Sequence, residues 1–153
     1  MKSRNIAGIC MLFIVCAHVA KAQEPISVNQ QPADKPFIFF QFPERVLFPY
    51  EELQKLFSYT INTSIDVSLE GGILLRGQLI NKIQRSQDVI SVTIKLSEYK
   101  GALFSLTFIH QPNQPTIISG RIIHPQSGDV LVLSKENNQY YLTKKLQQFF
   151  MTE

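Results

Sequence analysis

Residues 64–96, SIDVSLEGGILLRGQLINKIQRSQDVISVTIKL, decide the fold class of this chain. Apolar residues occupy every second position from Ile65 to Leu69 and again from Ile90 to Leu96. A period of two is typical of a strand with one buried face, and Gly71-Gly72 is typical of a turn between strands. The stretch therefore predicts strands over both alternating runs and over residues 73–84, which pair with the last run in a long hairpin.

The chain continues in the same way after residue 100. Further strands are predicted at 102–109, 116–123, 130–133 and 139–143. Short polar turns, and no helices, separate these runs, which favours antiparallel pairing of consecutive strands. Gly77 and Gly120 lie inside predicted strands, where a glycine typically marks a bulge or a bend. We expect a mainly β fold, either an antiparallel sandwich or a meander barrel of about seven to eight strands.

One short helix is expected before these strands, near residues 49–58. Pro49 suits the first helical position, and the acidic pair Glu51-Glu52 suits the positive end of the helix dipole. The apolar residues of the second half of this segment share one helical face. A second short helix is predicted at the C-terminus, over residues 144–150.

The first 22 residues have the pattern of an export signal. A positively charged start precedes the apolar stretch Ile6–Ala20, and Ala20-Lys21-Ala22 places small residues where a signal peptidase reads them. The stretch is shorter than the roughly 20 residues that a membrane-spanning helix needs. We therefore predict a signal peptide at 1–22, a flexible, proline-containing leader at 23–36 and a single β-rich domain at 37–153. The protein is expected to be periplasmic or secreted.

Removal of this signal changes the composition of the working protein. The signal contains both cysteines and three of the 15 Lys and Arg residues, whereas all 12 acidic residues follow it, leaving 12 basic against 12 acidic residues. The remaining domain has no thiol for a disulfide and lacks the basic excess that nucleic-acid binding requires. No later apolar run is long enough to span a membrane after signal cleavage.

Four phenylalanines crowd into the six residues before Pro43: Phe37, Phe39, Phe40 and Phe42. We predict a short strand there, at a sheet edge because prolines flank it. Alternation sends Phe37 and Phe39 to one face and Phe40 and Phe42 to the other, so both faces are apolar. The strand is either buried between the helix and the sheet, or it presents one face to a partner or ligand. These four residues are therefore candidate binding residues.

The segment His124–Asp129 combines an imidazole, a hydroxyl and a carboxylate, and Arg121 lies just before it. A working triad needs its groups on separate rigid elements, whereas a Ser-Gly-Asp tripeptide is common turn chemistry. In the turn interpretation, Gly128 supplies a positive φ and Asp129 a local hydrogen bond. We name Arg121, His124 and Asp129 as candidate partner- or ligand-binding residues and predict no catalytic residue.

A metal site is not expected. The hairpin predicted over residues 102–123 places His110 and His124 at opposite ends, roughly 26 Å apart at ~3.3 Å per residue. No cysteine remains after the signal to complete a zinc site. We also predict no cofactor.

Three functions are compatible with these features. The first is an exported, non-catalytic interaction module of the cell envelope with a protein partner there. The alternative is a β-barrel that binds a small apolar ligand, and a second alternative is a hydrolase that uses the His124–Asp129 turn.

Overall fold

The computed structural model describes residues 35–146. The predicted signal peptide at 1–22 and almost all of the 23–36 leader lie outside the described residues, as does the segment 147–153. The elements are β1 (Arg45–Phe48), α1 (Tyr50–Ser58), β2 (Ser64–Ser68), a 3-10 turn η2 (Glu70–Gly72), β3 (Leu74–Ser86), β4 (Val89–Leu96), β5 (Leu103–Ile109), β6 (Ile117–Ile123), β7 (Asp129–Glu136) and β8 (Gln139–Leu146).

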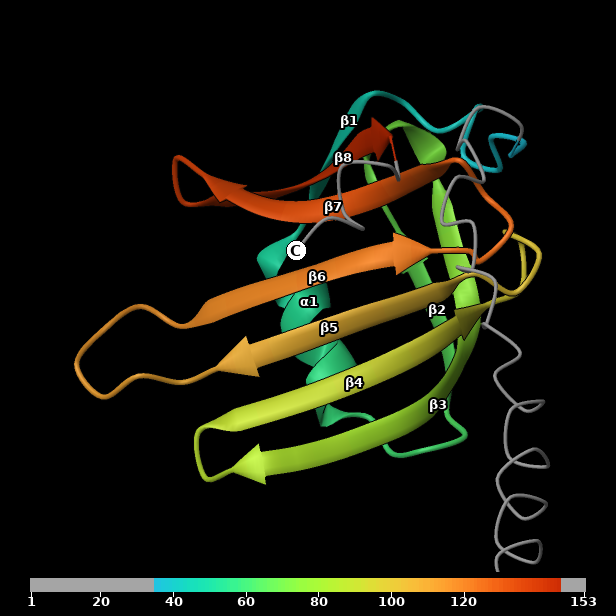
Figure 1. The fold of residues 1–153 in the computed structure, drawn as a ribbon. Coiled ribbons are helices and arrows are strands. Elements are labelled where there is room, and N and C mark those ends of the chain that lie inside the picture. Colours follow the sequence, from blue (N-terminus) through green and yellow to red (C-terminus); the bar gives the residue numbers. More distant parts are fainter. Residues whose placement is uncertain (1–34, 147–153) are drawn as a thin grey trace, which may run out of the picture. The chain divides into compact units, whose positions relative to one another are not determined.

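The eight strands form one sheet in the order β1-β8-β7-β6-β5-β4-β3-β2, and every neighbouring pair is antiparallel. From β2 to β8 each strand pairs with the next one in the sequence, and β1 joins the far side of β8. The sheet curls into a half-barrel, with α1 on one side of it (Figure 1). The prediction of a mainly β fold with consecutive antiparallel strands and one short helix near its start is confirmed.

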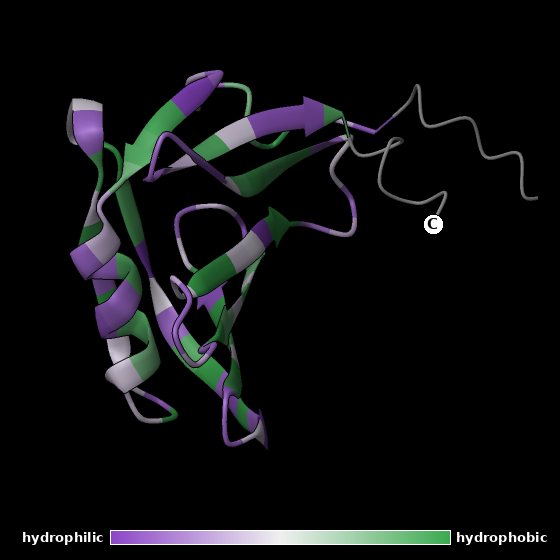
Figure 2. Cartoon of the chain, turned by 90° about the vertical axis from the view of Figure 1, so that its left-hand side faces the viewer, coloured by the Kyte–Doolittle hydropathy of each residue, from purple (hydrophilic) through white to green (hydrophobic). Residues whose placement is uncertain are grey.

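The core lies between the curled sheet and α1. Alternate residues of the central strands, such as Ile94 in β4 and Phe104 in β5, are buried, and Leu53 and Leu56 of α1 are buried on the side of the helix that faces them. Hydrophobic and hydrophilic residues alternate along the strands, and they lie on different sides of the helix (Figure 2). The predicted helix bounds are correct to within one residue. The helix starts at Tyr50, and Pro49 precedes its first turn instead of belonging to it.

Two glycines lie where neighbouring strands come close together. A Cβ atom on Gly77 would lie 2.3 Å from the carbonyl oxygen of Lys95, and one on Gly120 would lie 2.5 Å from the Leu106 side chain. The register of β3 against β4 shifts after Leu79 and again after Gln84 instead. The glycines therefore serve close approach of strands, and the nearer register shift lies two residues beyond Gly77.

Two local predictions are wrong. Residues 37–42 form a turn instead of a strand, and the first strand is 45–48, after Pro43. Residues 144–146 extend β8 instead of starting a helix, because they pair with the first residues of β7. The rest of that predicted helix, residues 147–150, lies outside the described residues. Between residues 35 and 146, no helix has the length and apolar character needed to cross a membrane.

Candidate functional site: an aromatic turn above an apolar pocket

In the turn at residues 37–42, phenylalanines three positions apart point to the same side. Phe39 and Phe42 are buried, whereas Phe37 and Phe40 are 53% and 66% exposed. The backbone N–H of Phe42 donates to the carbonyl of Phe39 at 2.9 Å, which closes the turn. Both buried rings pack against Tyr99, with ring centroids 5.6 and 6.4 Å apart. The predicted alternation was wrong because a turn, unlike a strand, returns a side chain to the same side after three residues.

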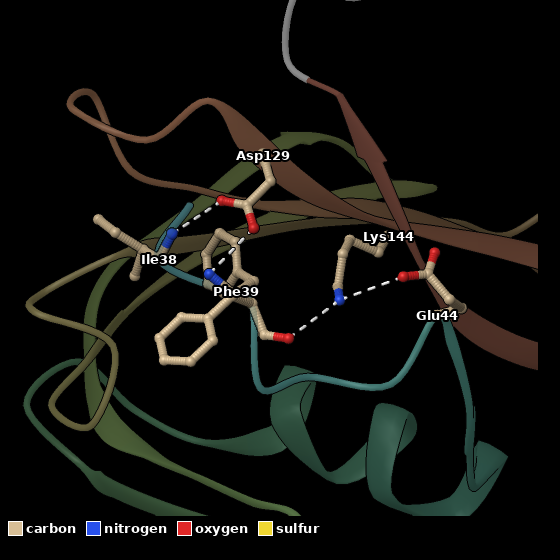
Figure 3. A network of polar contacts seen from close by, with 6 residues as sticks. Ile38, Phe39, Glu44, Asp129 and Lys144 are labelled. Carbon is tan, nitrogen blue, oxygen red and sulfur yellow. Dashed lines mark hydrogen bonds and ion pairs between the residues drawn. The ribbon is translucent and has the colours of Figure 1, made fainter. Parts of the chain in front are cut away.

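The carboxylate of Asp129 fixes this turn from the start of β7. It is 2% exposed and accepts the backbone N–H groups of Ile38 and Phe39, each at 3.0 Å (Figure 3). The hydroxyl of Ser127 lies against the same carboxylate as a further donor. Three donors compensate a buried charge that would otherwise be costly. Asp129 therefore makes the predicted local hydrogen bond, with Ser127, and also bonds to a segment about ninety residues away.

Ser127 and Gly128 hold the residue before the turn. The N–H of Gly128 donates to the carbonyl of Pro36 at 3.0 Å, and the buried Ser127 hydroxyl lies 3.3 Å from the same oxygen. Gly128 does not have the predicted positive φ. A Cβ atom there would lie 2.9 Å from the carbonyl oxygen of Lys35. This glycine is needed because the segment 35–42, which we call the strap, passes close to it.

The remaining members of the predicted cluster do not converge on a reacting centre. His124 accepts the N–H of Gln126 at 3.2 Å through Nδ1, so its imidazole closes its own turn. Arg121 lies exposed in β6 between Ser105 and Val132, and no hydrogen bond or ion pair joins it to His124 or Asp129 within residues 35–146. Ser127, which sequence reasoning omitted from the candidate residues, is fully buried.

The exposed phenylalanines stand beside a pocket of about 330 Å³, which we call the aromatic pocket. It is lined by Phe37, Phe40, Glu44, Asp129, Lys144, Lys145 and Leu146. Leu146, at the end of β8, is 42% exposed and completes its apolar wall. Sequence analysis named three of these residues and missed the other four. The signal was weak because Lys144, Lys145 and Leu146 become neighbours of the turn only through the pairing of β8 with β7 and β1.

Two lysines of different character border the aromatic pocket. Lys144 donates to the carbonyl of Phe40 at 3.4 Å and forms an ion pair with Glu44 at 3.3 Å (Figure 3). Its side chain is 17% exposed. Lys145 is exposed and has no ion pair with any residue of the described part. One ammonium group therefore helps to hold the turn, and the other faces solvent.

The two histidines of the described residues lie at opposite ends of the β5–β6 hairpin. Ile109 pairs with Ile117, and Leu103 pairs with Ile123, so His110 and His124 follow opposite ends of the ladder. Within residues 35–146 no group of three or more His, Cys, Asp or Glu side chains is arranged to hold a metal ion.

Comparisons with models of protein families, with curated proteins and with solved structures found no match for this chain. The site therefore has to be interpreted from its own geometry and chemistry.

Proposed function

We propose that this protein is an exported, non-catalytic interaction module of the cell envelope and that a protein partner binds at the aromatic pocket. The observation that supports this most directly is the display of Phe37 and Phe40. Burying a phenylalanine is worth about 1.5–3 kcal/mol, so an isolated domain would gain by turning these rings inward. Buried hydrogen bonds hold them outward instead.

The rigidity of this display favours binding. A contact residue that is already fixed loses little conformational entropy when a partner arrives, and aromatic residues that fill pockets dominate many protein interfaces. Asp129 and Lys144 bond to the backbone of residues 38–40, so the turn is held on both sides of its exposed tip. Export is supported by the sequence of residues 1–22, and an exported protein would meet its partner in the periplasm or outside the cell.

Photo-crosslinking in the native host tests this proposal. A benzophenone amino acid is placed at Phe40 and, as a control, at Ile117, which is 45% exposed at the start of β6. We expect a discrete crosslinked protein from position 40 and none from position 117, recovered from the envelope fraction. No product at position 40, or the same products at both positions, would refute an interface there.

A small apolar ligand is a second candidate, because about 330 Å³ lies at the lower end of the range for ligand pockets. In that case the curled sheet acts as an incomplete meander barrel with the pocket at its rim. Native mass spectrometry of the purified protein would then reveal a bound mass that the Phe40→Ser variant lacks. The hydrolase alternative is not proposed, because Ser127 and Asp129 are both buried and bonded to the strap that covers them.

A further inference from the structure

The pairing of β1 with β8 stops at the aromatic pocket. Arg45 pairs with Thr143, and the N–H of Lys144 donates to the carbonyl of Glu44 at 2.9 Å. Before Glu44, Pro43 takes the chain out of the sheet and into the turn. The next position along this edge of β8, opposite Leu146, is therefore left open by β1.

Leu146 directs its backbone groups toward that open position. In a strand, successive N–H and C=O groups point to opposite sides. Because Lys144 bonds toward β1, Lys145 bonds toward β7 and Leu146 points toward the β1 side again. No residue of the described part pairs with Leu146 on that side. An unpaired donor and acceptor at a sheet edge are a template for another strand.

The side chains around this open edge specify what would fit. Leu146 joins Phe37 and Phe40 in an apolar wall. Lys145, on the same strand, has no acidic partner within the described residues. An apolar group and a carboxylate on adjacent positions of an extended chain would complement both features.

We propose that the partner binds through an extended segment that adds to β8 beside Leu146, with an apolar side chain on Phe37 and Phe40 and an adjacent Asp or Glu on Lys145. This inference rests on the proposed function and names the chemistry of its partner. Backbone hydrogen bonds at the edge provide part of the affinity, and the apolar and acidic side chains provide the selectivity.

Selection from a library of random 12-residue displayed peptides against the purified protein tests this chemistry. We expect enrichment of peptides that carry an aromatic or large aliphatic residue next to Asp or Glu, in a stretch without proline. Enriched peptides that are basic or proline-rich, or no enrichment at all, would overturn the inference.

The affinity of the enriched peptide, made synthetically, is then measured by calorimetry to test each contact. Lys145→Glu and Phe40→Ser are each expected to weaken binding at least tenfold, whereas Lys95→Glu, an exposed lysine in β4, should change it less than twofold. Methylation of the backbone nitrogen of the apolar peptide residue should also weaken binding at least tenfold. Equal effects of the two lysine variants, or no effect of methylation, would contradict strand addition at this edge.

The same protein and peptide also test two other possible occupants of the edge, the chain's own segment 147–153 and a second copy of the chain. Peptide binding only to a variant that lacks residues 147–153 would show that the chain's own segment occupies the edge. A dimer in sedimentation experiments that Phe40→Ser abolishes would assign the edge to a second copy. Either result overturns the proposed occupant. A crosslink from position 40 in cells, combined with failure of the peptide selection, would retain the interaction function and reject the extended acidic segment.

Discussion

Asp129 is a buried carboxylate whose charge is balanced by backbone and hydroxyl donors within the described residues. Removing it leaves the N–H of Phe39 without an acceptor and leaves the N–H of Ile38 with the Ser127 hydroxyl alone, at 3.1 Å. Each buried donor left unsatisfied costs about 1–3 kcal/mol. The residue therefore controls both the stability of the strap and the position of the two exposed rings.

Asp129→Ala is expected to lower the free energy of unfolding by about 1–3 kcal/mol, mainly because the N–H of Phe39 loses its acceptor. Asp88→Asn, a change at an exposed turn, is the matched control and should stay within ~0.5 kcal/mol. Urea denaturation followed by circular dichroism measures both. A loss no larger for Asp129→Ala than for Asp88→Asn would show that the strap does not depend on this carboxylate.

The stability of the protein is expected to depend on Tyr99 at alkaline pH. Its burial, and to a lesser extent the charge of Glu98, raise the pKa of this phenol above the usual value of 10.0. The folded protein thus favours the neutral phenol, so its contribution to stability is complete below about pH 10 and is lost as the pH rises through the folded pKa.

We expect Tyr99→Phe to lose less stability than the native chain between pH 9 and about pH 11, because the variant has no proton to release at this position. Thermal unfolding of both proteins at the two pH values measures the difference. Parallel losses would mean that Tyr99 does not titrate differently in the folded and unfolded states.

At the scale of elements, neighbouring strands come into close contact at positions without a side chain. Gly120 of β6 lies opposite Leu106 of β5 and Leu133 of β7. Added volume there would meet the Leu106 side chain and the Ser105 carbonyl oxygen at 2.5 and 2.7 Å. The strands would have to separate or flatten to admit it.

Gly120→Ala is therefore expected to destabilise the protein by about 1–3 kcal/mol, although alanine is the better residue for a strand of ordinary spacing. Ser119→Ala, at the exposed neighbouring position of β6, is the control and should change stability little. Melting temperatures of the two variants provide the comparison. A stabilising effect of Gly120→Ala would show that the strands have room for a methyl group.

At the scale of the whole molecule, the predicted signal peptide determines the covalent structure expected for the mature protein. Both cysteines lie within residues 1–22, so cleavage there leaves a protein without thiols. The protein recovered from outside the cytoplasm is expected to begin at Gln23, to bind no thiol reagent and to keep its melting temperature in a reductant. Intact-mass spectrometry with and without alkylation tests this. A recovered chain that retains an alkylated Cys10 or Cys16 would contradict cleavage after Ala22.

Regular elements were predictable because their signals are local. The period of two in β2 to β6 and the apolar face of α1 survive in the structure, because each strand pairs with its neighbour in sequence and buries the face that the pattern indicates. The site was predicted only in part. Phe37, Phe40 and Asp129 were named, but the bonds of Asp129 to residues 38 and 39 were not foreseen, and the phenylalanines were assigned to a strand.

The sequence by itself determined the class of the fold, the position of its helix and the segment that carries the aromatic cluster, since hydrophobic periodicity and proline placement act over a few residues. Only the tertiary structure decided which phenylalanines are exposed and which residues surround them. Those outcomes depend on hydrogen bonds between the strap and Asp129 and on the register of β8 against β7 and β1. The bonds to Asp129 and the pairing of β1 with β8 join residues about ninety to one hundred positions apart, and the free energy that selects them arises only when the whole sheet has formed.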